Sequence, residues 1–83
     1  MKINENVTWK TLGEKVVAVK VETGEYYTMN EVSATIWKSI DEGLDTDQIA
    51  EKIMSEYDNE NKSSVLNDIK EQLSEWEQES LIL

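Results

Sequence analysis

The sequence contains no cysteine and no histidine, and these two absences exclude several kinds of site. Without cysteine the chain has no disulfide and no thiolate metal ligand. Without histidine it has no Ser–His or Cys–His catalytic arrangement and lacks the commonest imidazole metal ligand. A site made only of carboxylates stays open, because 18 residues are acidic. We expect those acids to be solvated on helix surfaces, so the sequence predicts no enzyme, no cofactor and no metal.

Positive charge is scarce, with 8 basic residues against 18 acidic ones, a net charge of −10 and a pI near 4.3. Such a charge repels phosphate backbones and anionic lipids, which disfavours nucleic acid and membrane surfaces as partners. It attracts cationic segments instead. The first ten residues, MKINENVTWK, lack the apolar region of a signal peptide, and no stretch is long enough to cross a membrane. We therefore expect a cytoplasmic protein.

A chain of 83 residues suffices for one small domain with one modest core, so we expect residues 1–83 to form a single domain. The 39% of hydrophobic residues argues against disorder. Internal repeats and low-complexity tracts are absent from the sequence.

The first part of the chain alternates as strands do. Segments 7–11, 15–22 and 25–29 predict three strands, with turns at 12–14 and at Thr23–Gly24. In the second strand Val17, Val19 and Val21 share one face. Three short strands in this order predict an antiparallel meander.

The period changes at Asn30, a residue favoured as an N-cap, and residues 31–41 predict an amphipathic helix that ends before Gly43. Its apolar positions are Val32, Ile36, Trp37 and Ile40.

Asp45 and Gln48 have the spacing of a capping box, and Leu44 and Ile49 have that of a hydrophobic staple, so a second helix is predicted to begin here. Its buried stripe comprises Ile49, Ala50, Ile53, Met54 and Tyr57. The polar run 58–62 predicts a loop, and Ser63 or Ser64 is expected to cap a third helix. The apolar stripe of that helix comprises Leu66, Ile69, Leu73 and Trp76, with Val65 beside it. The tail 81–83 is expected to pack back on the core.

The predicted fold class is therefore α+β, a three-stranded antiparallel meander followed by three helices in a winged helix-turn-helix-like arrangement. Many winged helices bind DNA through basic residues. Here the second helix offers only Lys52, and the third offers only Lys70 among several acids. A transcriptional regulator is therefore the weaker interpretation. The other use of such a shape is to bind a peptide as an additional strand at a free sheet edge.

The segment GEYYTMNEVSATIWKSID, followed by TDQIAEKI and a closing helix with a Leu–Ile end, resembles the PqqD-like family over about residues 16–83. The family pattern, a G-x-Y-Y-x-hydrophobic-N hairpin running into a helix with Ile–Trp, falls on Gly24, Tyr26, Tyr27, Met29, Asn30, Ile36 and Trp37. The resemblance implies a non-catalytic recognition element that binds the leader segment of a ribosomally synthesised precursor peptide. It implies that the leader pairs with the third strand, in a groove shared with the third helix.

Carried over from the resemblance, the peptide-binding positions are Glu25, Tyr26, Tyr27, Thr28, Met29, Val65, Asp68, Ile69, Gln72, Leu73 and Trp76. The implied partner is a maturation enzyme, either the cysteine leader peptidase of a lasso peptide pathway or a radical enzyme, as in pyrroloquinoline quinone biosynthesis. The acidic composition suits a lysine-bearing leader and favours the lasso setting.

Several points stay open at the level of sequence. Tyr26 and Tyr27 point to opposite faces of their strand, but the hairpin register that decides which one faces inward is not fixed. The third-helix stripe can be core or part of an open groove, and Asp68 and Gln72 can be contacts or solvated surface. Trp37 and Met29 are expected to be buried. For Trp9 the sequence does not decide between packing under the sheet and a free position near the N-terminus.

Overall fold

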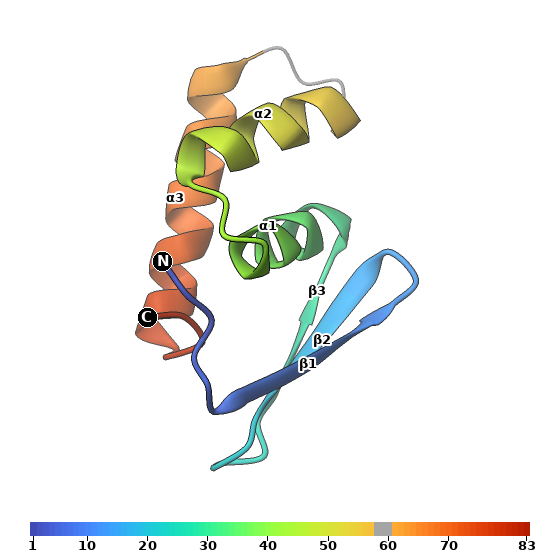
Figure 1. The fold of residues 1–83 in the computed structure, drawn as a ribbon, viewed down its shortest axis with the longest axis vertical. Helices are drawn as coiled ribbons and strands as arrows, with labels where there is room; N and C mark the ends of the chain where they lie inside the picture. The colour runs from blue at the N-terminus through green and yellow to red at the C-terminus, as the bar shows by residue number, and fades with distance from the viewer. Residues whose placement is uncertain (58–60) are drawn as a thin grey trace.

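The computed structural model describes residues 1–57 and 61–83 of the chain, and in these ranges three strands are followed by three helices (Figure 1). The elements are β1 (Val7–Leu12), β2 (Lys15–Lys20), β3 (Tyr26–Met29), α1 (Glu31–Asp41), α2 (Thr46–Tyr57) and α3 (Lys62–Gln78). The predicted α+β class and the predicted order of elements are confirmed.

The three strands form one antiparallel sheet in the order β1-β2-β3, so β3 is an edge strand. Its register pairs Val16 with Met29 and Ala18 with Tyr27. Because paired residues share a face, these four side chains point toward the helices, and Val16 and Ala18 are fully buried. Tyr26 points to the other face and is 71% exposed. Tyr27 is therefore the tyrosine that faces inward, toward the helices.

Two of the predicted turns depend on glycine. Gly24 has a φ of 76° in the hairpin between β2 and β3, and Gly43 has a φ of 85° just after α1. Side chains with a Cβ rarely adopt this conformation. After α1, the amides of Gly43 and Leu44 donate to the carbonyls of Ile40 and Ser39, each at 3.0 Å, and thereby end the helix.

The N-caps of α1 and α2 are those that the sequence predicts. The Asn30 side chain accepts from the Ser33 amide at 2.9 Å. The Asp45 amide donates to Gln48 Oε1 at 2.9 Å, and the Gln48 amide donates to Asp45 Oδ1 at 2.8 Å, which completes the capping box.

The predicted start of α3, with Ser63 or Ser64 as the cap, is wrong by two or three residues. The helix begins at Lys62 with Asn61 as its N-cap, and the Asn61 side chain accepts from the Ser64 amide at 3.1 Å. Ser63 and Ser64 therefore lie inside the first turn. The predicted loop comprised residues 58–62. Residues 58–60 lie outside the described ranges, Asn61 is the N-cap of α3, and Lys62 is the first residue of the helix.

A chain of three tryptophans joins the layers of the core. Trp37 of α1 is fully buried, and its ring packs edge-on against Trp9 of β1 at 6.3 Å and against Trp76 of α3 at 5.2 Å between centroids. Such edge-to-face pairs add about 0.5–1.5 kcal/mol each beyond their buried area. Trp37 and Met29 are buried as predicted, and Trp9 is placed on the helix side of the sheet.

Five side chains predicted to be buried are less buried than expected, and two of them, Met54 and Tyr57 of α2, are half-buried. Val32 is 40% exposed, because the first turn of α1 borders a hollow at the tip of the β1–β2 hairpin. Leu66 is only half-buried at the edge of the α3 stripe. In the tail Leu81 and Ile82 are buried, and Ile82 bridges to Ile3, but Leu83 is 67% exposed. Among the described residues, no helix is both long and apolar enough to span a membrane.

Candidate functional site

The free edge of β3 presents a defined set of backbone groups. The Lys20 amide donates to the Glu25 carbonyl at 2.8 Å, which marks that pair as hydrogen-bonded across the β2–β3 ladder. Because antiparallel pairing alternates, the backbone groups of Tyr27 and Met29 also face β2. The N–H and C=O groups of Tyr26 and Thr28 therefore face outward. No other described strand pairs with this edge.

A groove of about 310 Å³ runs beside this edge, between β3, the start of α1 and the second half of α3. Its lining residues are Glu25, Tyr27, Thr28, Met29, Asn30, Ser33, Gln72, Glu75, Trp76 and Glu79. Because Trp76 also packs against Trp37, the wall of the groove is continuous with the core.

Two hydrogen bonds cross the groove and link its walls. The Tyr27 hydroxyl donates to Glu79 Oε2 at 3.0 Å, and the Ser33 hydroxyl donates to Gln72 Oε1 at 2.8 Å. Gln72 in turn donates from Nε2 to Glu75 Oε2 at 3.5 Å. These bonds hold β3 and α1 against α3, and they orient polar side chains in the groove.

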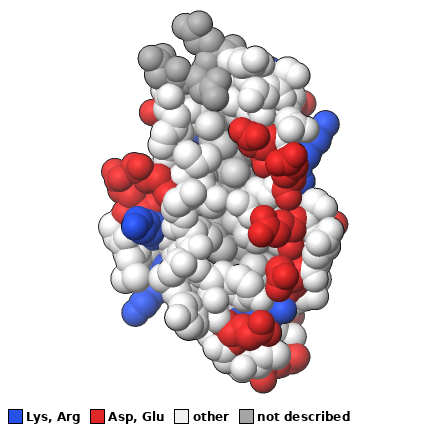
Figure 2. Space-filling model, turned by 180° about the vertical axis from the view of Figure 1, so that it is seen from behind, with Lys and Arg blue, Asp and Glu red and all other residues white. Residues whose placement is uncertain are grey.

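The charge of the groove is negative. Helical spacing places Asp68, Glu71, Glu75 and Glu79 along one stripe of α3, next to the groove wall. The face seen from behind in Figure 2 shows a column of acidic side chains beside a band of uncharged surface. Partial burial, the hydrogen bond to Glu79 and the nearby carboxylates raise the pKa of Tyr27 to about 12. The phenol therefore stays protonated and can keep donating to Glu79.

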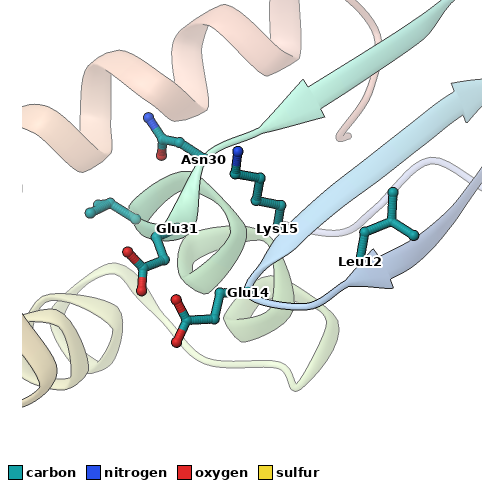
Figure 3. A pocket seen from close by; sticks show the side chains of 6 residues that line it. Leu12, Glu14, Lys15, Asn30 and Glu31 are labelled. Atoms are coloured by element: carbon teal, nitrogen blue, oxygen red, sulfur yellow. The ribbon is translucent and has the colours of Figure 1, made fainter.

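A second hollow adjoins the groove at Asn30, which lines both (Figure 3). The Glu14 carboxyl from the β1–β2 turn and the Glu31 carboxyl from α1 point toward each other there. A hydrogen bond with Glu14 and repulsion from its charge raise the pKa of Glu31. This hollow also exposes Leu12 and Val32, beside Lys15.

The structure separates the predicted site residues into three groups. Glu25, Tyr27, Thr28, Met29, Gln72 and Trp76 line the groove. Val65, Ile69 and Leu73 are at most 9% exposed and do not line the groove, so their side chains belong to the core. Leu73 borders a separate hollow, together with Leu44 and Leu83. Tyr26 offers its backbone to the edge while its ring lies on the opposite face, and Asp68 is exposed on the acidic stripe.

Four groove residues are absent from the sequence-based set, namely Asn30, Ser33, Glu75 and Glu79. The two glutamates follow Gln72 and Trp76 by three residues each, so helical spacing alone indicates that they share this wall. Asn30 and Ser33 form the cap of α1, which places them at the end of β3.

The helices offer little to a DNA backbone. Lys52 of α2 pairs with Glu42 at 3.5 Å, and Lys62 of α3 pairs with Glu51 at 3.2 Å. Within the described ranges, no group of three or more acidic residues is arranged to hold a metal ion.

Comparison with known proteins identifies the family to which this chain belongs. The family of coenzyme PQQ synthesis protein D (PqqD) matches residues 15–82, which is most of the chain. The chain belongs to the PqqD family. The resemblance seen in the sequence is thereby confirmed, and the groove lies within the matched residues. No curated protein sequence matches the chain.

Two solved structures share the PqqD-like fold over 99% of this chain. TbiB1, in complex with the TbiA(beta) leader peptide, superposes with a TM-score of 0.93 and 27% identity over 94% of its own length. A lasso peptide synthetase B1, complexed with its leader peptide, superposes with a TM-score of 0.89 over 95% of its length. At 18% identity the second likeness supports the fold alone.

Proposed function

We propose that this PqqD-like protein is a non-catalytic adaptor that binds the leader segment of a ribosomally synthesised precursor peptide as a fourth strand beside β3. The observation that carries the proposal is the free edge of β3 next to a groove. The similarity to TbiB1, which binds a leader peptide, supports the same use of this chain.

The energetics require both the edge and the groove. Tyr26 and Thr28 offer four backbone groups, and at about 0.5–1.5 kcal/mol for each hydrogen bond the edge contributes about 2–6 kcal/mol. Association costs roughly 4–15 kcal/mol, so the edge alone does not hold a peptide. Each apolar side chain of the peptide that is buried in the groove adds about 1.5–3 kcal/mol. Two such anchors bring the total to the lower end of that cost, and Met29 and Trp76, which are 4% and 5% exposed, are the apolar residues of β3 and α3 that border the groove.

The peptide we propose carries lysine or arginine near its anchors. Glu25, Glu75 and Glu79 line the groove, and the net charge of the chain is −10. Opposite charge raises the association rate and favours a cationic segment over an anionic one. Higher salt is therefore expected to weaken binding moderately.

The recipient of the bound peptide is, in this proposal, the cysteine leader peptidase of a lasso peptide pathway. The acidic groove, which suits a lysine-bearing leader, favours this setting. The match to the PQQ synthesis family favours a second candidate, in which the chain presents a precursor to a radical enzyme. The neighbouring genes discriminate the two, because a lasso pathway needs a peptidase and an asparagine-synthetase-like cyclase.

The direct test uses the leader of the precursor encoded beside this chain, labelled with fluorescein and measured by fluorescence anisotropy. We expect saturable binding that weakens as salt rises, and no binding of a scrambled leader of the same composition. Equal binding of the two peptides would remove the proposal. Binding that does not respond to salt would remove its electrostatic part.

A further inference from the structure

In the described part of the chain, one face of the sheet is not covered by a helix. All three helices lie on the same side of the sheet (Figure 1), and α1 packs on β2 and β3. The cross-strand register assigns eight strand residues to the opposite, outer face, namely Thr8, Lys10, Leu12, Lys15, Val17, Val19, Tyr26 and Thr28. We call this set the outer face.

The outer face differs in charge from the rest of the molecule. None of its residues is acidic, and two of them are lysines, although the chain has 18 acids and 8 bases. Among the described residues, neither Lys10 nor Lys15 forms an ion pair, although Lys15 also borders the hollow that holds Glu14 and Glu31. In an acidic protein, such a face attracts a partner whose own surface carries carboxylates.

The centre of the outer face is apolar. Val17 and Val19 lie half-buried on the central strand, and Tyr26 beside them is 71% exposed. A shallow hollow of about 250 Å³ is lined by Thr8, Trp9, Lys10 and the two valines. A half-buried apolar centre with a polar and charged rim is the arrangement of protein–protein interfaces.

We propose that the outer face docks the enzyme that processes the bound peptide, through an enzyme surface that is apolar at its centre and rimmed with carboxylates. The inference rests on the proposed function. The acidic groove and the basic outer face select opposite charges, so peptide and enzyme bind the same adaptor without competing for one surface. A second copy of the chain fits less well, because two such faces bring lysines together in molecules that each carry a charge of −10.

The bound peptide enlarges this docking surface. A strand added beside β3 extends the sheet, and its alternate side chains point to the outer face next to Tyr26 and Thr28. An enzyme on this face then touches adaptor and peptide together. The enzyme therefore has a higher affinity for the adaptor when the peptide is bound. By linkage, the enzyme raises the affinity of the adaptor for the peptide by the same factor.

The test measures how the purified cysteine peptidase encoded beside this chain binds the adaptor, with and without the leader of its precursor. Lys15→Glu and Lys70→Glu form a matched pair, because both lysines are exposed, neither is ion-paired within residues 1–57 and 61–83, and each change shifts the charge equally. We expect Lys15→Glu to weaken docking about tenfold and Lys70→Glu to leave it unchanged. Val19→Glu is expected to weaken docking at least as much. All three variants should bind the leader like the original protein.

The outcomes separate the two proposals. If the unaltered adaptor does not bind the leader, the proposed function fails. If it binds the leader but the peptidase docks equally well to Lys15→Glu and Lys70→Glu, only the docking face is overturned. The docking face is also overturned if the leader leaves peptidase affinity unchanged, or if sedimentation shows a dimer that Val19→Glu dissociates. Urea unfolding of each variant confirms that it is folded.

Discussion

Proline at position 28 removes one N–H from the free edge of β3 and leaves the ladder to β2 intact. The Thr28 amide faces outward, so the fold loses no hydrogen bond, whereas an added strand loses one. The missing bond and the peptide carbonyl left without a partner together weaken binding by about 1–3 kcal/mol, or roughly five- to 150-fold.

Thr11→Pro is the matched control. The Val21 amide donates to the Asn6 carbonyl, and by alternation the Thr11 amide faces outward at the opposite edge of the sheet, on β1. Both variants thus place proline at an edge threonine. We expect both to remain folded in urea titrations, and only Thr28→Pro to lose affinity in fluorescence anisotropy. A folded Thr28→Pro protein with unchanged affinity, or equal losses in the two variants, would refute strand addition at β3.

Three further predictions concern the walls of the groove and the fold behind it. Because Ile69 is fully buried, Ile69→Ala should lower the free energy of unfolding by about 2–5 kcal/mol, and Ile69→Asp should prevent folding. An Ile69→Asp protein that folds but does not bind the peptide would instead place this side chain in the groove. Asp45→Ala breaks the capping box and should cost about 0.5–2 kcal/mol in urea unfolding, against no loss for Glu56→Ala, which removes an exposed acid from the last turn of the same helix. The pKa of Tyr27 is raised to about 12 in the folded state, so its contribution to the free energy of unfolding is complete below pH 10 and is lost as the pH rises through 12. The free energy of unfolding should therefore fall less over this pH range in Tyr27→Phe than in the original protein. An equal fall in the two proteins would contradict the hydrogen bond between Tyr27 and Glu79.

The elements of this fold can be predicted from sequence because their ends are chemically marked. Asn30, Asp45 and Gln48 form the caps that their spacing indicates, and each turn glycine has a positive φ. The start of α3 was harder, because Asn61, Ser63 and Ser64 all suit an N-cap and only the packing of the helix selects among them.

The site was less predictable, because it depends on register and depth. The sequence requires Tyr26 and Tyr27 to face opposite ways, but the pairing of Ala18 with Tyr27 decides which one lines the groove. Likewise, the residues of the α3 stripe would be apolar whether they pack in the core or line an open groove, so the sequence does not distinguish the two. Only tertiary packing shows that Ile69 is core, while Trp76, seven residues later, borders the groove.

Amide hydrogen exchange of β3, measured by NMR with and without the precursor's leader, is the most direct test of whether the leader pairs with this strand. We expect the Tyr27 and Met29 amides to be protected in both states, and the Tyr26 and Thr28 amides to exchange quickly in the free protein and to become protected when the leader binds. Leader binding that leaves the Tyr26 and Thr28 amides unprotected would show that the peptide does not pair with this strand.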